Sequence, residues 1–224
     1  MPRRFGIAPR VTAGVLLAAA ILFAQSKRPE DLAVGKLLVT PRDAPDPTFA
    51  ESVILLVHYD HDSAVGLMIN RRTTIPLSRA LRNLKGAGQR SDPAYIGGPV
   101  ETDSAMALIR SDTKPNSSAQ VLDRIYLVPS RPALEAALAG GKSTADLRVY
   151  VGYCGWGPGQ LDNEMRLGAW YILEGNAALV FDPNPDTVWS RLIARSESNV
   201  ALARRPLRLG GESATAGSSA RLLP

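Results

Sequence analysis

The chain has 224 residues, 45% hydrophobic and 21% charged, a composition typical of a globular protein with a substantial core. Its formal net charge of +5 comes from its ends: residues 1–28 hold five basic residues and no acid, residues 204–224 hold four basic residues and one acid, and the 17 basic and 20 acidic residues between them give −3. A single cysteine excludes an internal disulfide, and the slightly acidic body argues against a nucleic-acid-binding domain.

The amino terminus has the layout of an export signal. Three arginines within residues 1–10 precede residues 11–24, which carry no charge. Residues 1–26 are therefore predicted to be a signal peptide or membrane-anchor segment, followed by a linker over residues 27–34. Ala24 suits the position before a cleavage site, whereas Leu22 is larger than the small residue preferred two places earlier. The alternatives are a wrongly assigned start in a cytoplasmic protein and a helix of the folded domain.

The body, residues 35–203, begins with β-structure. Residues 35–41 form a short β-rich run that ends at Pro41, and a turn-forming stretch with two further prolines follows. Residues 53–57 and 64–69 are predicted to pair as a hairpin across a polar turn. Further strands are expected at residues 94–100, 105–110, 125–128 and 147–151, with a late pair at 169–173 and 177–181.

Other segments have a helical period. Residues 75–85 place four apolar side chains on one face, and Arg79, Arg82 and Lys85 on the other. With Arg71, Arg72 and Arg90 these give a basic stretch, for which a solvated face is favoured over a phosphate or membrane patch. Further helices are predicted from Ser130 to Gly140, from residue 162 onward, and over residues 187–195. Residues 204–224 are predicted to be a disordered tail.

The strand at residues 147–151 leads into Gly152-Tyr-Cys-Gly-Trp-Gly-Pro-Gly-Gln-Leu161. Four glycines and a proline within residues 152–159 predict a tight, irregular loop. We expect this loop to be packed rather than mobile, because Tyr153 and Trp156 must bury large apolar surfaces.

Potential catalytic groups are few. Cys154 would need a base, and only His58 and His61 are available; a lone cysteine beside a core strand is more often a buried small hydrophobe. The two histidines bracket acidic residues, but polar residues are expected in that turn without a metal. The sequence therefore predicts no catalytic residue, no metal ligand and no cofactor.

Several motifs together resemble one known family. Gly35-Lys-Leu-Leu-Val39, Phe49-x-x-Ser-Val-Ile54, Gly66-Leu-Met-Ile-Asn-Arg71, Gly97-Gly-Pro-Val100 and the segment from Gly152 to Leu161 occur in the order and spacing of the bacterial YqgE/AlgH family. The resemblance spans residues 35–203. It implies a single compact α+β domain with mixed, bifurcated β-structure, partly barrel-like, surrounded by helices. It implies no established activity, although AlgH-like proteins carry the label of transcriptional regulator, and most members look cytoplasmic.

We therefore expect a non-enzymatic binding or regulatory module whose ligand is an unidentified protein or small molecule, with a possible membrane tether through residues 1–26. The alternatives are a transcriptional regulator, as the family label suggests, and a hydrolase or thiol enzyme using Cys154. A purely structural role, in which the glycine segments turn corners and pack a tryptophan, is the simpler interpretation of the same residues. The candidate binding residues lie on those segments and beside them: Asn70, Gly97, Gly98, Pro99, Gly155, Trp156, Gly157, Gly159 and Gln160.

Overall fold

The computed structural model describes residues 31–203. In chain order its elements are β1 (Lys36–Val39), η2 (Pro47–Phe49), β2 (Val53–Tyr59), β3 (Ala64–Met68), β4 (Arg72–Pro76), α2 (Leu77–Ala80), β5 (Pro93–Ile96), β6 (Val100–Arg110), β7 (Ala119–Leu122), β8 (Ile125–Val128), α3 (Arg131–Ala139), β9 (Leu147–Trp156), α4 (Gln160–Leu167), β10 (Tyr171–Glu174), α5 (Ala177–Val180), η3 (Pro185–Thr187) and α6 (Val188–Ala203).

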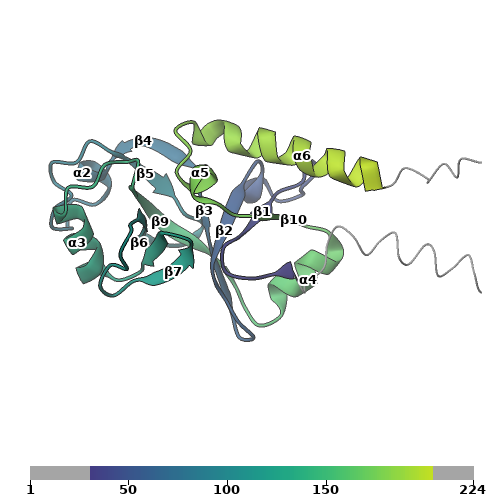
Figure 1. Ribbon diagram of the computed structural model, residues 1–224, viewed down its shortest axis with the longest axis horizontal. Helices are drawn as coiled ribbons and strands as arrows, with labels where there is room; N and C mark the ends of the chain where they lie inside the picture. The colour runs from purple at the N-terminus through teal and green to yellow at the C-terminus, as the bar shows by residue number, and fades with distance from the viewer. Residues whose placement is uncertain (1–30, 204–224) are drawn as a thin grey trace, which may run out of the picture.

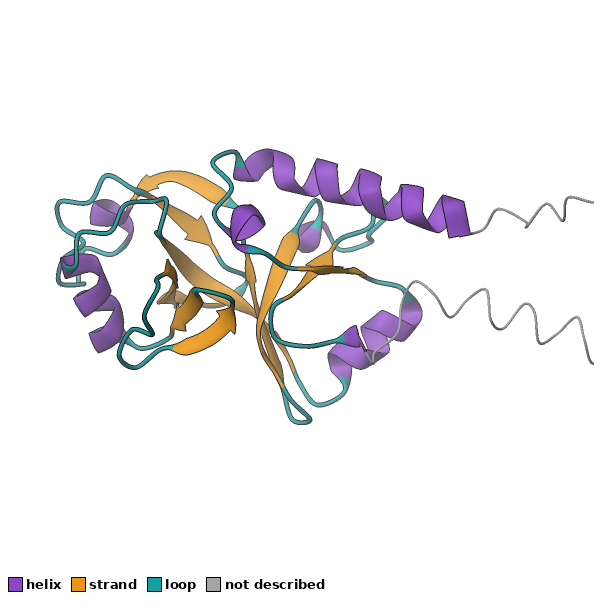
Figure 2. Ribbon diagram, in the orientation of Figure 1, coloured by secondary structure: helices purple, strands orange, loops and turns teal. Residues whose placement is uncertain are grey.

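The strands form one branched sheet (Figures 1 and 2). Its main path is β10-β1-β2-β3-β9-β6-β8-β7, and β5 with its neighbour β4 branches from β9. The pairing of β5 with β9 is parallel, and the other pairings among the described strands are antiparallel. The α+β class and the mixed, bifurcated β-structure predicted above are thus confirmed.

Helices cover both faces of the sheet. Along β2, Val53, Leu55 and Val57 pack in a core that includes the buried residues of α6, while Ile54 and Leu56 pack on the opposite face, where α4 lies. A third core joins α2 and α3 to β6, β8 and β9. Because β2 is buried on both faces, its sequence is continuously apolar rather than alternating.

Two segments differ from their predicted conformation. The helix expected over residues 75–85 shrinks to the single turn α2, because residues 72–76 pair with β5 as strand β4. The strand expected over residues 177–181 is instead the short helix α5, whose first turn is capped by the Asn176 side chain accepting from the Leu179 N–H at 3.0 Å. Tertiary pairing in the first case and a cap in the second override the local apolar pattern.

The loop predicted over residues 152–159 is mostly strand. β9 continues through Gly152 to Trp156, and only residues 157–159 turn before α4. Gly152 has a positive φ of 69°, a conformation that glycine adopts without strain. Beyond this residue β9 pairs with β3, for example Cys154 with Gly66. Strand β7 was not predicted, and the helix predicted from Ser130 is present as α3, although the Ser130 side chain makes no cap hydrogen bond.

The predicted export segment, residues 1–26, and the predicted tail, residues 204–224, lie outside the described residues. Of the predicted linker, residues 31–34 are described, and Leu32 among them is 94% buried, in the core beside α4. Among the helices of residues 31–203, none is both long and apolar enough to cross a membrane.

Candidate functional site

The two glycine segments singled out in the sequence meet, but backbone to backbone. The Gly97 N–H donates to the Val151 carbonyl at 2.8 Å, and the Gly97 carbonyl accepts from the Met68 N–H at 2.9 Å. A Cβ atom on Gly97 would lie 2.1 Å from the Gly152 oxygen, and one on Gly98 would lie 2.2 Å from the Tyr153 carbonyl carbon. These glycines therefore permit two strands to cross at close range, and the Gly97 amide is already occupied.

Asn70 also has a local structural role. Its Oδ1 accepts from the Val53 N–H at 2.8 Å, and its Nδ2 donates to the Glu51 carbonyl at 2.9 Å. The side chain is 93% buried, so it joins the end of β3 to the start of β2 and does not face solvent. Pro99, which follows the glycine pair, is exposed.

Trp156 belongs to an aromatic cluster centred on a carboxylate. Its indole N–H and that of Trp170 both donate to Oε2 of Glu164, each at 2.9 Å. The two indole rings meet edge to face with centroids 6.3 Å apart, and Phe49 meets Trp170 in the same way at 5.6 Å. A single carboxylate from α4 thus fixes two nearly buried indoles, and charge-assisted hydrogen bonds of this type are the stronger ones.

Gln160 extends this network toward the exposed turn before α4. Its Nε2 donates to Oε1 of Glu164 at 2.9 Å, and its Oε1 accepts from the Gly157 N–H at 3.2 Å. Gly155, Gly157 and Gly159 are exposed. Gln160 thus links the Gly157 N–H to the Glu164 carboxylate, so the turn before α4 is hydrogen-bonded to the same carboxylate as the two tryptophans.

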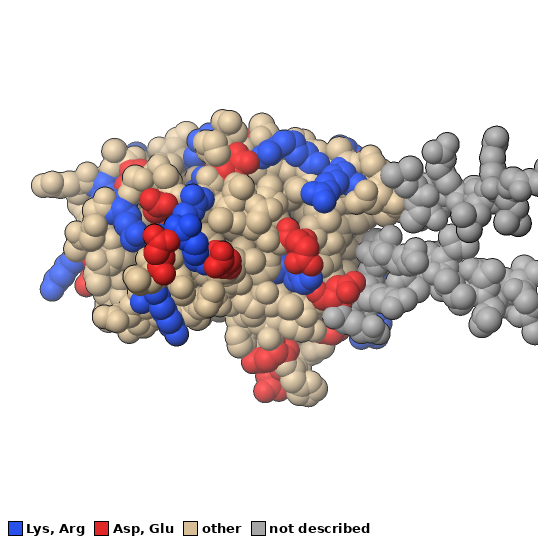
Figure 3. Space-filling view, viewed as in Figure 1, with Lys and Arg blue, Asp and Glu red and all other residues tan. Residues whose placement is uncertain are grey.

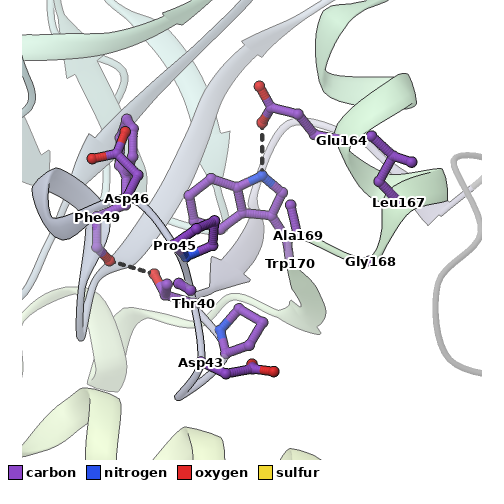
Figure 4. A pocket seen from close by; sticks show the side chains of 12 residues that line it. Thr40, Asp43, Pro45, Asp46, Phe49, Glu164, Leu167, Gly168, Ala169 and Trp170 are labelled. Carbon is purple, nitrogen blue, oxygen red and sulfur yellow. Dashed lines mark hydrogen bonds between the residues drawn. The ribbon is translucent and has the colours of Figure 1, made fainter.

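A cavity of about 450 Å³ lies against this cluster, in contact with Phe49, Glu164 and Trp170 (Figure 4). Its wall is formed by the loop between β1 and β2, the end of α4 and the turn into β10: Thr40, Pro41, Asp43, Ala44, Pro45, Asp46, Phe49, Glu164, Leu167, Gly168, Ala169 and Trp170. Figure 4 shows the indole of Trp170 between Pro45 and the Glu164 carboxylate. None of these residues was among the binding residues predicted from the sequence, because the loop after β1 has only a turn signal and no chemical motif.

A second hollow, of about 550 Å³, includes one predicted residue, Gly159. It lies between the β2–β3 turn and the start of α4. There the Tyr59 hydroxyl donates to Asp162 at 3.0 Å, and burial followed by this hydrogen bond raises the pKa of Tyr59. Its lining includes three charged or polar side chains, Asp60, His61 and Asp162, so it offers less of the apolar surface that usually drives small-molecule binding than the first cavity does.

Cys154 is not poised as a nucleophile. The thiol is 99% buried and contacts the Gly97 carbonyl at 3.5 Å, and burial raises its pKa to about 12. A reactive cysteine needs the opposite shift and a nearby base. His58 and His61 are exposed on the β2–β3 turn, where His58 lies 2.9 Å from Asp60. Within the described part of the chain, no group of three His, Cys, Asp or Glu side chains could hold a metal ion.

The basic stretch predicted from the sequence does not form a uniform patch. Arg72 pairs with Asp186 at 2.7 Å, Arg90 pairs with Asp92 at 2.5 Å, and Arg71 donates to the Ala50 carbonyl. Arg79, Arg82 and Lys85 are exposed. On the face seen in Figure 3, Lys and Arg side chains lie beside Asp and Glu rather than in a separate region. Half of the stretch is thus used in internal contacts.

The fold and the site define a class: an α+β domain built on a curled, half-barrel sheet, with a tryptophan-walled cavity beside α4. The chain belongs to the AlgH-like family DUF179, whose profile matches residues 37–201. A UPF0301 protein of Streptomyces avermitilis is 32% identical over 173 residues, covering 75% of this chain and 89% of the relative. One from Caulobacter vibrioides is 34% identical over 167 residues, covering 72% and 86%.

Two solved structures have the same fold. The solution structure of the AlgH protein from Pseudomonas aeruginosa superposes with a TM-score of 0.61 at 29% identity, covering 83% of this chain and 95% of that one. A crystal structure of a protein from Corynebacterium diphtheriae gives a TM-score of 0.64 at 20% identity, covering 82% and 96%. The resemblance found in the sequence motifs is therefore confirmed, and the names of these relatives specify no activity.

Proposed function

We propose that this AlgH-like domain is a non-enzymatic binding module whose ligand occupies the cavity beside Trp170. The observation that carries the proposal is the cavity itself. Its volume of about 450 Å³ falls within the range of small-molecule sites, roughly 300–1,000 Å³, and its wall combines apolar side chains with a few polar groups. Nothing in this arrangement requires a catalytic residue.

The wall of the cavity is held in place before any ligand arrives. Glu164 is fixed by two indole N–H groups and by Gln160, and Trp170 is fixed by Phe49 as well. Thr40 Oγ1 donates to the Phe49 carbonyl at 2.7 Å, and this hydrogen bond connects the start of the β1–β2 loop to a residue near its end. A preformed wall lowers the entropy cost of binding, as a binding module requires. Burial of Cys154 weighs against the thiol-enzyme alternative.

A ligand screen with a blocked cavity tests this function. Thermal shifts are measured across metabolites, nucleotides and peptides for the wild type and for Ala44→Trp, which places a large side chain on a wall residue that is only partly buried. Ala178→Trp, on the exposed side of α5, is the matched control. We expect at least one class to stabilise the wild type and the control but not Ala44→Trp. Stabilisation that survives Ala44→Trp, or none in any class, would contradict the proposal.

We also propose that residues 1–26 export the domain or tether it to a membrane, because a basic start is followed by an uncharged apolar run. A cytoplasmic location, as for most of the family, is the alternative. Fusing residues 1–30 to a reporter enzyme that is active only outside the cytoplasm separates the two. Activity that disappears when Leu16→Arg and Leu17→Arg interrupt the apolar run supports export, whereas an inactive fusion supports the cytoplasm.

A further inference from the structure

The ionisable side chains on the cavity wall all carry the same charge. They are Asp43 and Asp46 from the loop after β1, and Glu164 from α4 (Figure 4). Among residues 31–203, no lysine, arginine or histidine lines the cavity. Arg42 precedes Asp43 but pairs with Glu197 at 2.9 Å and lies over the ring of Trp189 at 5.4 Å. The basic group closest in sequence is therefore already engaged with residues of α6.

Within residues 31–203, the hydrogen bonds that these carboxylates accept come from neutral donors. Glu164 accepts from two indole N–H groups and one amide, and Asp46 accepts from the Thr48 N–H at 2.8 Å. Across the described residues, none of the three carboxylates forms a salt bridge. Hydrogen bonds from neutral donors leave the charge of the carboxylates in place, so this part of the described chain holds three acidic groups without a paired basic side chain.

The remaining wall is apolar and partly uncovered. Leu167, at the end of α4, is 78% exposed, the most exposed large hydrophobic side chain of the described chain. Phe49 and Ala169 are half-buried on the same wall. An exposed leucine on the rim of a cavity provides surface that a bound apolar group would cover. The wall is thus complementary both to a positive charge and to an apolar surface on a ligand.

From this combination we infer that the cavity binds an organic cation: a small-molecule amine or guanidine with an apolar or aromatic body. The inference rests on the proposed function, since it names the ligand class of the same cavity. Charge complementarity favours a cation over a neutral molecule and opposes an anion. The apolar part of the wall favours an organic cation over a bare metal ion, and no metal-binding group of three side chains occurs among the described residues.

The test uses three probes of matched shape: 2-phenylethylamine, 2-phenylethanol and phenylacetate. Their binding to the ¹⁵N-labelled protein is followed through the indole N–H signals of its three tryptophans. Trp156 and Trp170 donate to Glu164, whereas Trp189 does not line the cavity and reaches it only through its hydrogen bond to the carbonyl of the wall residue Thr40. We expect the amine to move the first two signals far more than the third.

The charge preference is read from affinities at low and high salt. We expect the amine to bind about tenfold more tightly than the alcohol at low salt and to lose much of this advantage at 0.5 M salt, while phenylacetate binds least. Asp43→Asn combined with Asp46→Asn should remove most of the advantage and leave the alcohol unchanged. Asp103→Asn, an exposed acid on β6 outside the cavity, is the control and should change neither affinity.

The outcomes separate the two proposals. If the alcohol or phenylacetate binds as tightly as the amine, or if the double variant leaves the amine affinity unchanged, the preference for a cation is wrong while the cavity remains a binding site. If none of the three probes moves the signals of Trp156 and Trp170, the cavity is not a binding site for molecules of this size, and the proposed function fails with the inference.

Discussion

Removing the carboxylate of Glu164 should destabilise the domain substantially. Glu164→Ala leaves the indole N–H groups of Trp156 and Trp170 without their acceptor, although the two side chains are 94% and 96% buried. Hydrogen bonds to a charged group contribute about 1.5–3 kcal/mol each, and both bonds here are only part-buried. Two such bonds would sum to about 3–6 kcal/mol, and discounting this sum for their partial exposure we expect a loss of roughly 2–4 kcal/mol in the free energy of unfolding.

Urea denaturation followed by far-UV circular dichroism measures this loss without depending on tryptophan fluorescence. The midpoint should fall while the m-value stays unchanged, as for a change in stability alone. For a domain of this size the same loss corresponds to a drop in Tm of about 4–16 °C. Glu164→Gln is the matched control, because its amide oxygen can still accept from the indoles, and it should cost about 1 kcal/mol or less.

A double-mutant cycle tests whether the hydrogen bonds are responsible. Trp170→Phe removes one indole N–H but keeps an aromatic ring, so Glu164→Ala should cost about half as much in that background. An equal cost in both backgrounds would show that the carboxylate acts through something other than the indoles. A cost below about 0.5 kcal/mol in the wild type would refute the reasoning altogether, since exposed surface substitutions lie in that range.

Three further outcomes are expected. Gly98→Ala should lower stability by more than about 3 kcal/mol or prevent folding, whereas Gly157→Ala, with nothing within 4 Å of its added carbon, should change urea stability by less than about 0.5 kcal/mol. The Cys154 thiol should resist alkylation in the native state at pH 8 and react on unfolding. Because burial raises the pKa of this thiol from 9.0 to about 12, its contribution to the free energy of unfolding is complete below pH 9 and is lost as the pH rises toward 12. Arg148→Met should cost roughly 2–4 kcal/mol, since the buried guanidinium donates to the Val180 and Asp182 carbonyls, and Arg79→Met, at an exposed position, should cost less than about 0.5 kcal/mol in the same assay.

Local patterns predicted much of the framework. The hairpin of β2 and β3, the strands β1, β5, β6 and β8, and the helices α3, α4 and α6 lie close to their predicted positions. Val188 and Leu192, four residues apart on α6, are both buried, as expected for one face of a helix. These elements have a clear period and clear ends, which are properties of neighbouring residues. The elements that were wrong, α2 with β4 and α5, are short segments where a distant strand or a cap outweighs weak local preference.

The glycine segments mark the limit of sequence patterns. Glycine clusters predict turns, yet Gly152 to Trp156 continue a strand, because β3 and β6 supply partners that are far away in the sequence. Gly97 and Gly98 are required for the same reason: their missing side chains leave room for another backbone. The sequence shows that these positions are glycines, but the requirement for glycine comes from the close crossing of two strands that are distant in the sequence.

The amino-acid sequence by itself determined the family, the α+β class and the order of most elements, because motifs, apolar period and turn residues act over short distances. The tertiary structure alone decided that Glu164 joins Trp156 to Trp170 and that three carboxylates share one cavity wall. Asp43 and Glu164 are far apart in the chain and carry no spacing signal. Only the packing of α4 against the loop after β1 brings their charges to the same surface, and charge interactions depend on that distance in space.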